Sequence, residues 1–390
     1  MASSRAAVGI IGCGNISEAY LTLAPRFNNV EIVAVADIVP AAAEKRAKQF
    51  NVSALRVDEL LEDDGIDVVV NLTIPDVHYD VTKEILSAGK HAYTEKPMAL
   101  NYKDAAKLVK DADKRGLKLG SAPDTFLGAG MQTVRQLIDK GTIGKVLGGT
   151  AYVMGHGMEA WHPNPGFFFR PGAGPVFDIG VYYITALVSL LGGVKSVTAM
   201  ASMGFATRTV TSDGPMKGKK IKVETPTNIN AILEFANGAH ITLGASWDVW
   251  KHGHANPIEL YGTTGSMLVP DPNFFSGKIA HSEGAGDYHD IDAATGPQPF
   301  GAYNWPPAGP FTRANYRMLG VADLVDAART KREPRCSGRN AAHVVEVMEA
   351  ILTAAEKRSF VAIKSEAARP APITAAFAKK ISAEPVAAAA

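Results

Sequence analysis

The sequence is poor in cysteine and has no long uncharged apolar run. Its only two cysteines among 390 residues, Cys13 and Cys336, lie far apart and lack metal-ligand spacing. A disulfide framework and a zinc site are therefore not expected, and a reducing, cytoplasmic setting fits. The segment from Met1 to Ala7 lacks the apolar core of a signal peptide. No stretch of about 18 uncharged apolar residues occurs, so no membrane span is expected.

The chain also lacks an excess of charge of either sign. It has 40 basic and 39 acidic residues, hence a formal net charge of +1, and the basic residues are scattered. This balance gives no electrostatic reason to expect a nucleic acid or an anionic membrane as partner. With 46% hydrophobic and 20% charged residues the composition is that of an ordinary globular protein. The length is enough for two domains with sizeable cores.

Over the first 122 residues, apolar β-branched runs alternate with amphipathic stretches. The predicted strands are residues 7–11, 32–36, 68–72, 92–94 and 117–122, and the predicted helices are residues 16–23, 40–50, 77–88 and 102–114. Near-continuous apolar strands between helices indicate a parallel sheet covered on both faces. The N-terminal part is therefore predicted to be a doubly wound α/β domain.

After Pro123 the pattern becomes β-rich, with many glycines, prolines and aromatic residues. A predicted helix at 131–140 precedes predicted strands at 147–153, 195–201, 228–234, 239–246, 257–262 and 266–269. These strands predict a largely antiparallel sheet. Residues 277–310 predict a long surface loop, and two helices are predicted at 313–329 and 341–357. The predicted domains are residues 1–123 and 124–364, followed by a tail, 365–390, expected to be partly disordered or to wrap a neighbour.

A glycine pattern joins the first predicted strand to the first predicted helix. Gly12 permits a tight turn, and Gly14 lets the backbone approach a pyrophosphate held at the helix N-terminus. Ser17 occupies the third position of the pattern, and Asp37 follows 20 residues later at the end of the second strand. A carboxylate there binds ribose hydroxyls, so the segment predicts a dinucleotide-binding Rossmann domain. The alternative is a glycine turn beside a solvated aspartate.

Asp37 also favours NAD over NADP. Its carboxylate repels a 2′-phosphate, and the residues that follow, Ile38, Val39 and Pro40, offer no arginine or serine to hold one.

Two segments carry candidate catalytic side chains. Glu95-Lys96-Pro97 follows the predicted strand at 92–94, and ligands bind at such strand ends in doubly wound sheets, so Lys96 is expected near the nicotinamide. In residues 172–183 a glycine-rich loop runs into a helix, and Asp178 and Tyr182 share a face because they are four residues apart. The structural alternatives are a surface lysine, a helix-start carboxylate and a half-buried aromatic.

With these motifs the chain resembles the Gfo/Idh/MocA family over almost its whole length, to about residue 364. The segments that carry the resemblance are residues 9–16, 75–78, 95–97, 172–183 and 259–265. The resemblance implies an NAD(P)-dependent oxidoreductase acting on sugars, polyols and their keto forms. It also implies a second α/β domain with a large open, mostly antiparallel sheet, whose outer face forms a homodimer or homotetramer.

The resemblance further implies the roles of individual residues. The catalytic lysine falls on Lys96 and the substrate-binding aspartate on Asp178. Many members have a histidine where this chain has Tyr182, so Tyr182 is the expected general base and His162 its competitor. We expect the Tyr182 hydroxyl to face Lys96, which lowers the phenol pKa, and Asp178 to face the substrate. The implied cofactor-binding residues are Gly12, Gly14, Asn15, Ile16, Asp37, Thr73, Pro75, His78, Glu95 and Lys96.

Residues 156–170 interleave polar groups with aromatic rings, a pattern that suits a sugar. The candidate substrate-binding residues are His156, Trp161, His162, Arg170, Lys96, Asp178 and Tyr182. A structural loop of stacked aromatics is the alternative. The two histidines would bind a metal only with a carboxylate partner, and no metal is expected.

Taken together, the motifs favour an NAD-dependent dehydrogenase that oxidises a hydroxyl of a sugar, sugar derivative or cyclitol by hydride transfer. A keto-sugar reductase and an NAD-dependent glycoside-cleaving enzyme are alternatives, because the same catalytic residues can serve oxidation of an alcohol and reduction of a ketone. A non-catalytic NAD-binding regulator is a further alternative, against which intact Lys96, Asp178 and Tyr182 argue.

Overall fold

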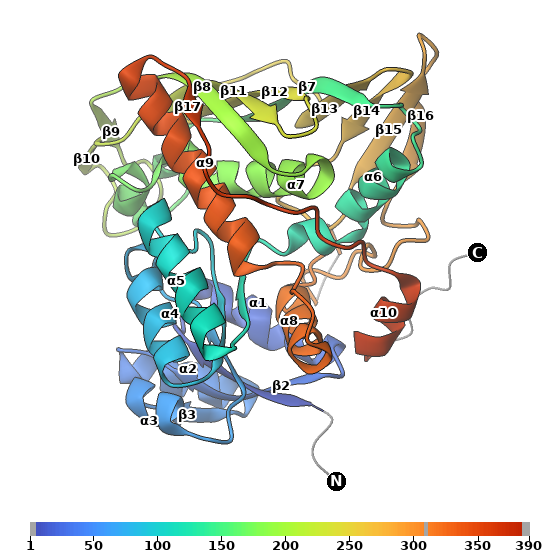
Figure 1. The fold of residues 1–390 in the computed structure, drawn as a ribbon. Helices are drawn as coiled ribbons and strands as arrows, with labels where there is room; N and C mark the ends of the chain where they lie inside the picture. Colours follow the sequence, from blue (N-terminus) through green and yellow to red (C-terminus); the bar gives the residue numbers. More distant parts are fainter. Residues whose placement is uncertain (1–4, 308–310, 384–390) are drawn as a thin grey trace.

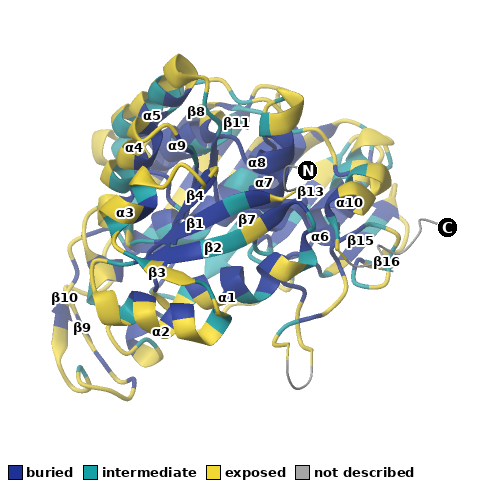
Figure 2. Ribbon diagram, turned by 90° about the horizontal axis from the view of Figure 1, so that it is seen from below, coloured by how far each residue is buried: buried dark blue, intermediate teal, exposed yellow. Residues whose placement is uncertain are grey.

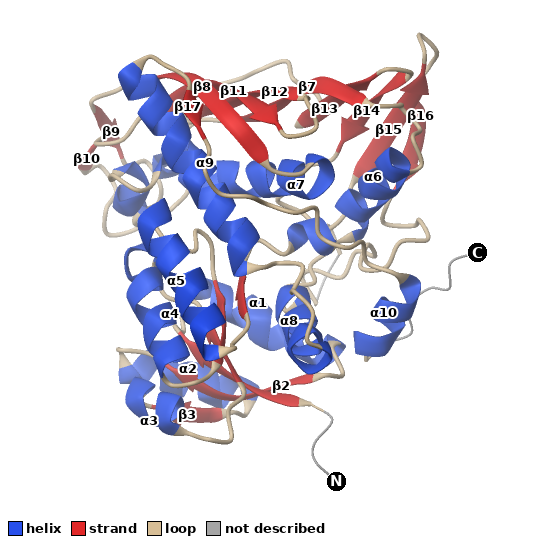
Figure 3. Ribbon diagram, in the orientation of Figure 1, coloured by secondary structure: helices blue, strands red, loops and turns tan. Residues whose placement is uncertain are grey.

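The computed structural model describes residues 5–307 and 311–383 (Figure 1). Two sheets form separate layers, each with its own helices, and helices from both layers meet between them (Figure 3). Within the described ranges, no helix has both the length and the apolar character needed to cross a membrane.

The N-terminal layer is a six-stranded parallel sheet in the order β3-β2-β1-β4-β5-β6. Its central strands are buried on both faces, as Figure 2 shows for β1 and β4. The order reverses between β1 and β4, and ligands bind at the carboxyl ends of strands at such a switch point. The elements are β1 (Ala6–Ile11), α1 (Asn15–Leu23), β2 (Val30–Ala36), α2 (Pro40–Phe50), β3 (Ser53–Leu55), α3 (Val57–Glu62), β4 (Val68–Asn71), α4 (His78–Ser87), β5 (His91–Thr94), α5 (Tyr102–Arg115) and β6 (Leu119–Ser121).

The predicted doubly wound sheet is confirmed, with two elements added. Sequence reasoning missed β3 and α3, because β3 is a short, largely exposed edge strand without a buried apolar run. The other strands and helices lie within a few residues of their predicted positions.

The second layer is a nine-stranded sheet in the order β16-β15-β14-β13-β7-β12-β11-β8-β17. All neighbours are antiparallel except β7 and β12, which run parallel. Burial alternates along β11, as expected for a sheet with one covered face. The strands are β7 (Val146–Met154), β8 (Val194–Ser202), β11 (Asn228–Phe235), β12 (His240–Ser246), β13 (Ile258–Gly262), β14 (Gly265–Val269), β15 (Lys278–Glu283), β16 (His289–Asp292) and β17 (Val361–Ala362), with a separate hairpin of β9 (Thr207–Thr209) and β10 (Lys220–Lys222).

The large antiparallel sheet is therefore confirmed, but the surface loop predicted at 277–310 is wrong in its first part. Strands β15 and β16 lie there and extend one end of the sheet. Their short length and their charged and histidine side chains hide the alternation on which the strand prediction depends.

Helices α6 (Ala129–Asp139), α7 (Val181–Leu191) and α9 (Gly338–Lys357) cover the inner face of the second sheet (Figure 1). Helix α8 (Leu319–Thr330) instead packs against β2 and β6 of the first sheet, and α9 also packs on α5. The C-terminal part of the chain thus packs against both layers. The domain bounds at residues 123 and 364 remain a proposal.

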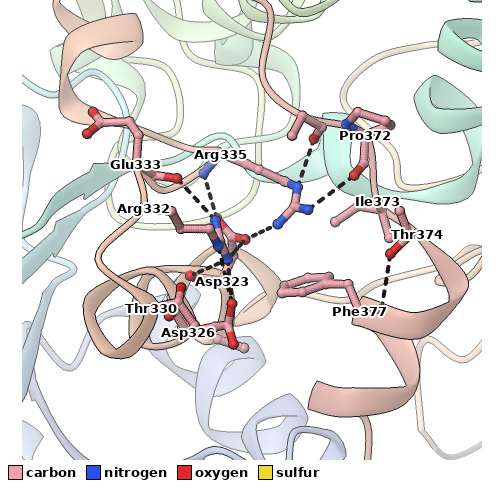
Figure 4. Close-up of polar contacts among 12 residues, drawn as sticks. Asp323, Asp326, Thr330, Arg332, Glu333, Arg335, Pro372, Ile373, Thr374 and Phe377 are labelled. Carbon is pink, nitrogen blue, oxygen red and sulfur yellow. Dashed lines mark hydrogen bonds and ion pairs between the residues drawn. The ribbon is translucent and has the colours of Figure 1, made fainter.

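The tail, as far as it is described, to residue 383, lies against its own chain. Arg335 donates to the carbonyl oxygens of Ala371 (2.8 Å) and Pro372 (3.1 Å), and its guanidinium stacks on Phe377 of α10 (Ala375–Ile381) (Figure 4). At the far end, the Asn28 N–H donates to the Ile381 carbonyl at 2.8 Å. The tail therefore links the segment after α8 to the N-terminal layer. Residues 384–390 lie outside the described part.

Asp323 anchors this arrangement from inside α8. It is fully buried and accepts hydrogen bonds from the Arg335 N–H and the Arg332 guanidinium, both at 2.6 Å (Figure 4). We expect Asp323→Ala to lower the free energy of unfolding by about 3–5 kcal/mol, because the guanidinium groups of Arg332 and Arg335 both pair with this carboxylate and would lose it. Denaturant unfolding measures this. The exposed pair Arg339–Asp113 is the control, for which Arg339→Ala should cost less than about 1 kcal/mol. Equal effects at the two sites would contradict the prediction.

Candidate active site

The glycine turn after β1 leaves room for a pyrophosphate. Gly12 has φ +104°, and a Cβ on it would lie 2.5 Å from the backbone carbon of Leu72, so only glycine fits between β1 and the end of β4. Gly14 is the N-cap of α1 and has no protein atom within 4 Å of the Cβ position. The N-terminus of α1 therefore faces open space with free N–H groups, as a dinucleotide phosphate requires.

Asp37 stands beside this turn at the end of β2. Its two carboxylate oxygens accept the N–H groups of Cys13 (2.7 Å) and Val39 (2.8 Å). Each oxygen keeps a lone pair for a further donor such as a ribose hydroxyl. Sequence reasoning missed Arg46, which donates to the Gly14 carbonyl at 3.4 Å and pairs with Glu18 at 2.8 Å. The cation nearest the turn thus already has a carboxylate partner.

A cavity of about 360 Å³ opens where β4 and β5 end. The first domain contributes the residues just after these strands, including Pro75 and Lys96. The second domain contributes Asn164, Phe167, Phe168, Arg170 and the segment from Pro171 to Asp178. The predicted residues Lys96, Asp178, Pro75 and Arg170 therefore line one cavity, together with Phe167 and Phe168 of the predicted sugar-binding segment 156–170.

Lys96 and Asp178 form an ion pair across this cavity. The Lys96 ammonium donates to Asp178 Oδ1 at 2.9 Å and to the Asp178 carbonyl at 2.6 Å. Asp178 lies in a single π turn, Val176–Gly180, that opens α7 in place of the regular helix expected there. Burial lowers the pKa of Lys96, but Asp178, Tyr182 and Glu95 outweigh burial and leave this pKa raised. The ammonium therefore stays charged.

Tyr182 lies next to this pair, one turn further along. Lys96 Nζ lies 5.2 Å from the centre of its ring, while its hydroxyl oxygen accepts from Arg317 at 3.4 Å. The expected orientation is thus wrong: Asp178 binds Lys96, because a carboxylate is a stronger partner for ammonium than a neutral phenol. Burial raises the pKa of Tyr182, and Lys96 and Arg317 only partly oppose this. The expected net lowering of its pKa is therefore not found either.

Glu95 and His78 are enclosed by protein and do not line the cavity. The His78 ring bonds the carbonyl oxygens of Pro97 (2.7 Å) and Thr73 (3.0 Å), which ties together the loops after β5 and β4. Glu95 accepts the Tyr20 hydroxyl at 2.9 Å. These two residues support the loops that carry the site.

His156, Trp161 and His162 do not line the cavity either, contrary to expectation. The His156 ring stacks on Trp250 with centroids 3.4 Å apart and accepts from Arg208 at 3.1 Å. Arg208, itself buried, also pairs with Glu159 at 2.7 Å and with Asp248. This ion cluster holds His156 away from the cavity. His162 packs edge-on against Phe168, while Trp161 is exposed.

A second cleft, of about 470 Å³, lies at the start of α1. It is lined by Asn15, Ile16 and residues of the segment before α8, including Arg313 and Arg317. No local motif marks Arg317, because its contact with Tyr182 spans 135 residues of sequence. Among the described residues, no group of three or more His, Cys, Asp or Glu side chains is arranged to hold a metal ion.

Comparison with known families agrees with this architecture. Residues 6–122 match the family model described as "Oxidoreductase family, NAD-binding Rossmann fold", and residues 131–268 match the "GFO/IDH/MocA C-terminal domain". The chain belongs to the Gfo/Idh/MocA family. Its first domain is thus the NAD-binding Rossmann domain of an oxidoreductase family.

Individual relatives extend the comparison. The chain is 33% identical to an inositol 2-dehydrogenase/D-chiro-inositol 3-dehydrogenase of Lactiplantibacillus plantarum, over 36% of this chain and 41% of that protein. It is 24% identical to a levoglucosan dehydrogenase of Pseudarthrobacter phenanthrenivorans, over 91% and 97%. The matches to three relatives at 30% identity or more span under half of their length.

Solved structures show the same fold. A levoglucosan dehydrogenase in complex with NADH and L-sorbose has a TM-score of 0.78 at 21% identity, and covers 93% of this chain and 100% of its own. An NAD-binding oxidoreductase from Klebsiella pneumoniae has a TM-score of 0.76 at 22% identity, with the same coverage.

The two glycines of the turn should respond differently to alanine. Gly14→Ala should fold normally, because its φ of −69° and the open space accept a methyl group. It should weaken NADH binding by about tenfold or more, which corresponds to about 1.4 kcal/mol of lost approach to the phosphates. Gly12→Ala should lower the melting temperature, since its Cβ meets the Leu72 backbone. Fluorescence titration with NADH and thermal melts distinguish them. Wild-type NADH affinity in Gly14→Ala would place the phosphates elsewhere.

Proposed function

We propose that this protein is an NAD-dependent dehydrogenase that oxidises a hydroxyl of a sugar, sugar derivative or cyclitol. The observation that carries the proposal is the ion pair of Lys96 with Asp178 (2.9 Å) at the cavity where β4 and β5 end, with the ring centre of the buried Tyr182 5.2 Å from the Lys96 ammonium. A charged donor and a carboxylate in one cavity, with a buried phenol beside them, suit alcohol–carbonyl chemistry. The family relatives named as inositol and levoglucosan dehydrogenases support the substrate class.

The cofactor would be held by the glycine turn at Gly12 and Gly14, by Asp37 and by the loops that contain Pro75 and Lys96. When bound, the dinucleotide supplies a hydride acceptor. We propose NAD over NADP, because Asp37 presents a carboxylate and the adjacent Ile38 is fully solvent-facing and apolar. Arg46, the cation near the turn, is engaged by Glu18.

Three side chains of the protein then have separate roles in the proposed reaction. Lys96 stays protonated and stabilises negative charge that develops on the reacting oxygen. Asp178 fixes Lys96 and has lone pairs left to accept a neighbouring substrate hydroxyl. Tyr182 exchanges the proton of the reacting hydroxyl. Phe167 and Phe168 offer ring faces to a sugar ring, while Asn164 and Arg170 offer polar groups.

Reduction of a keto-sugar is the second candidate. The raised pKa of Tyr182 favours it, because a phenol that keeps its proton at neutral pH is ready to protonate an alkoxide. The same residues serve both directions, so the two candidates differ in which direction is faster at neutral pH.

We further propose a homodimer or homotetramer formed by the outer face of the second sheet. No described helix covers this face (Figure 1). Register places Met200, Ile232 and Tyr261 on it, each with 41–74% of its surface exposed. Exposed apolar side chains gathered on one sheet face favour a self-complementary contact. A cytoplasmic location is proposed because both cysteines are free and buried.

A spectrophotometric screen of sugars and inositols with NAD and with NADP tests the proposed reaction. We expect turnover with a polyhydroxylated substrate and a higher kcat/KM with NAD. Lys96→Met should lower kcat by about a hundredfold or more, the scale of one preorganised charge, while NADH still binds. The absence of turnover with every polyol and keto-sugar would contradict the proposed reaction. A clear preference for NADP would contradict the proposed cofactor.

The pH profile tests the role of Tyr182. Because its pKa is raised above the ordinary value near 10, we expect the oxidation rate to keep rising with pH up to and beyond about pH 10. Tyr182→Phe should lower kcat about a hundredfold and flatten this rise. His162→Ala is the control and should retain the rise. If instead Tyr182→Phe remains active and His162→Ala abolishes the pH dependence, the general base is His162.

Light scattering tests the oligomer. We expect a mass of two or four times 41.2 kDa at micromolar concentration. The double variant Met200→Glu with Ile232→Glu should dissociate, because it places like charges on the paired faces. Lys110→Glu on the exposed side of α5 is the control. A wild-type monomer would refute the proposed assembly.

A further inference from the structure

Arg317 has a fixed place beside Tyr182 that the proposed mechanism does not yet use. It precedes α8 and follows a segment closed by two asparagines. The Asn304 amide donates to the Asn315 carbonyl at 2.9 Å, and the Asn315 N–H returns a bond to Asn304 Oδ1 at 2.7 Å. The Arg317 N–H donates to Asn315 Oδ1 at 3.3 Å. The backbone from which the guanidinium extends is therefore well held.

Buried acidic groups lie close enough to Arg317 to influence its charge. Burial lowers the pKa of Arg317, but Tyr182, Glu95, Tyr20 and Asp124 outweigh burial and leave it raised. Asp124 is buried and accepts the N–H of Gly320 at 3.0 Å, which faces it toward the start of α8. Arg317 is therefore a permanent cation.

The groups that face Tyr182 come from several elements and act in opposite senses. Lys96, after β5, and Arg317, before α8, favour its ionised form, while Glu95 and Asp178 oppose it. The Lys96 charge is directed at Asp178, with contacts of 2.9 Å and 2.6 Å. The cation directed at the hydroxyl oxygen is Arg317, at 3.4 Å. Arg317 also lines the cleft with Asn15 and Ile16.

We infer that Arg317 is a positioning residue that holds the Tyr182 oxygen and favours its deprotonated form during proton transfer. This inference rests on the proposed function. In the oxidation direction the proton of the substrate hydroxyl moves to the Tyr182 phenolate, which becomes phenol. The carbinol carbon gives up its hydride to the bound dinucleotide. Arg317 keeps all its protons throughout and acts only through its charge and hydrogen bond.

The test compares two arginines of the same cleft. Arg313→Gln removes an exposed charge four residues before Arg317 and is the matched control. Ionisation of Tyr182 is followed by carbon-13 NMR of labelled tyrosine, with its signal identified by its loss in Tyr182→Phe. Arg317→Gln should raise the Tyr182 pKa by about one unit or more, as expected for a lost opposite charge within 4–6 Å. Arg313→Gln should leave this pKa unchanged.

Kinetics provide the second readout. In Arg317→Gln the alkaline rise of the oxidation rate should move upward by the same amount, so that kcat near neutral pH falls about tenfold per pKa unit. The substrate KM should change little. Arg317→Lys keeps the charge but loses the planar fork, so it should restore most of the rate. It also carries the test if Arg317→Gln does not fold.

Several outcomes would overturn the inference. One is an unchanged Tyr182 pKa and pH profile in both Arg317 variants, with only NADH binding weakened, which would make Arg317 a cofactor contact alone. Another is a wild-type Tyr182 that does not ionise at any pH at which the protein stays folded. Failure of the proposed function is distinguishable, because the NMR shift needs no substrate. A protein inactive on every polyol can still show the Tyr182 shift in Arg317→Gln.

Discussion

A partly buried ammonium needs a carboxylate, and this requirement joins the two layers at the candidate site. Lys96 comes from the loop after β5, and Asp178 from the turn that opens α7 in the second layer. Without Asp178, Lys96 would be a desolvated charge without a carboxylate partner, which is strongly unfavourable. The ion pair therefore stabilises the contact of the second layer with the carboxyl ends of the parallel strands. The cavity between Pro75 and Arg170 follows from that placement.

Other contacts keep this junction rigid from a distance. Helix α8 belongs to the late sequence but packs on the first sheet, and Asp323 within it binds two arginines. One of them, Arg335, holds the tail, and the Ile381 carbonyl of the tail accepts the N–H of Asn28, just before β2. The chain thus crosses between the layers more than once, and relative motion of the layers would disturb several buried polar contacts. A site assembled from both layers depends on this restraint.

The parts of the fold that the sequence predicts are those with a local signal. Strands with continuous apolar runs, the turn at Gly12 and the carboxylate at Asp37 depend on neighbours within a few tens of residues. The contacts that escaped prediction join distant segments: Arg317 meets Tyr182 across 135 residues, and Arg208 holds His156 across 52. The segment 156–170 was predicted to bind the substrate through its histidine and aromatic side chains. The buried Arg208, 52 residues from His156, instead holds His156 in an ion cluster. The local sequence pattern predicts candidate residues. Charge pairs between distant segments determine which of these residues face the cavity.

The charges around Tyr182 explain why its phenol keeps its proton in the absence of ligands. Two cations, Lys96 and Arg317, oppose the carboxylates of Glu95 and Asp178, and burial adds a further cost to any new anion. The positive and negative groups are thus nearly balanced, and ionising the phenol would leave an excess of negative charge in a desolvated place. A further positive charge nearby would shift this balance toward the phenolate. In the proposed reaction an oxidised nicotinamide would carry such a charge, and a reduced nicotinamide would not. The same fixed charges would then suit a proton donor for reduction and a proton acceptor for oxidation.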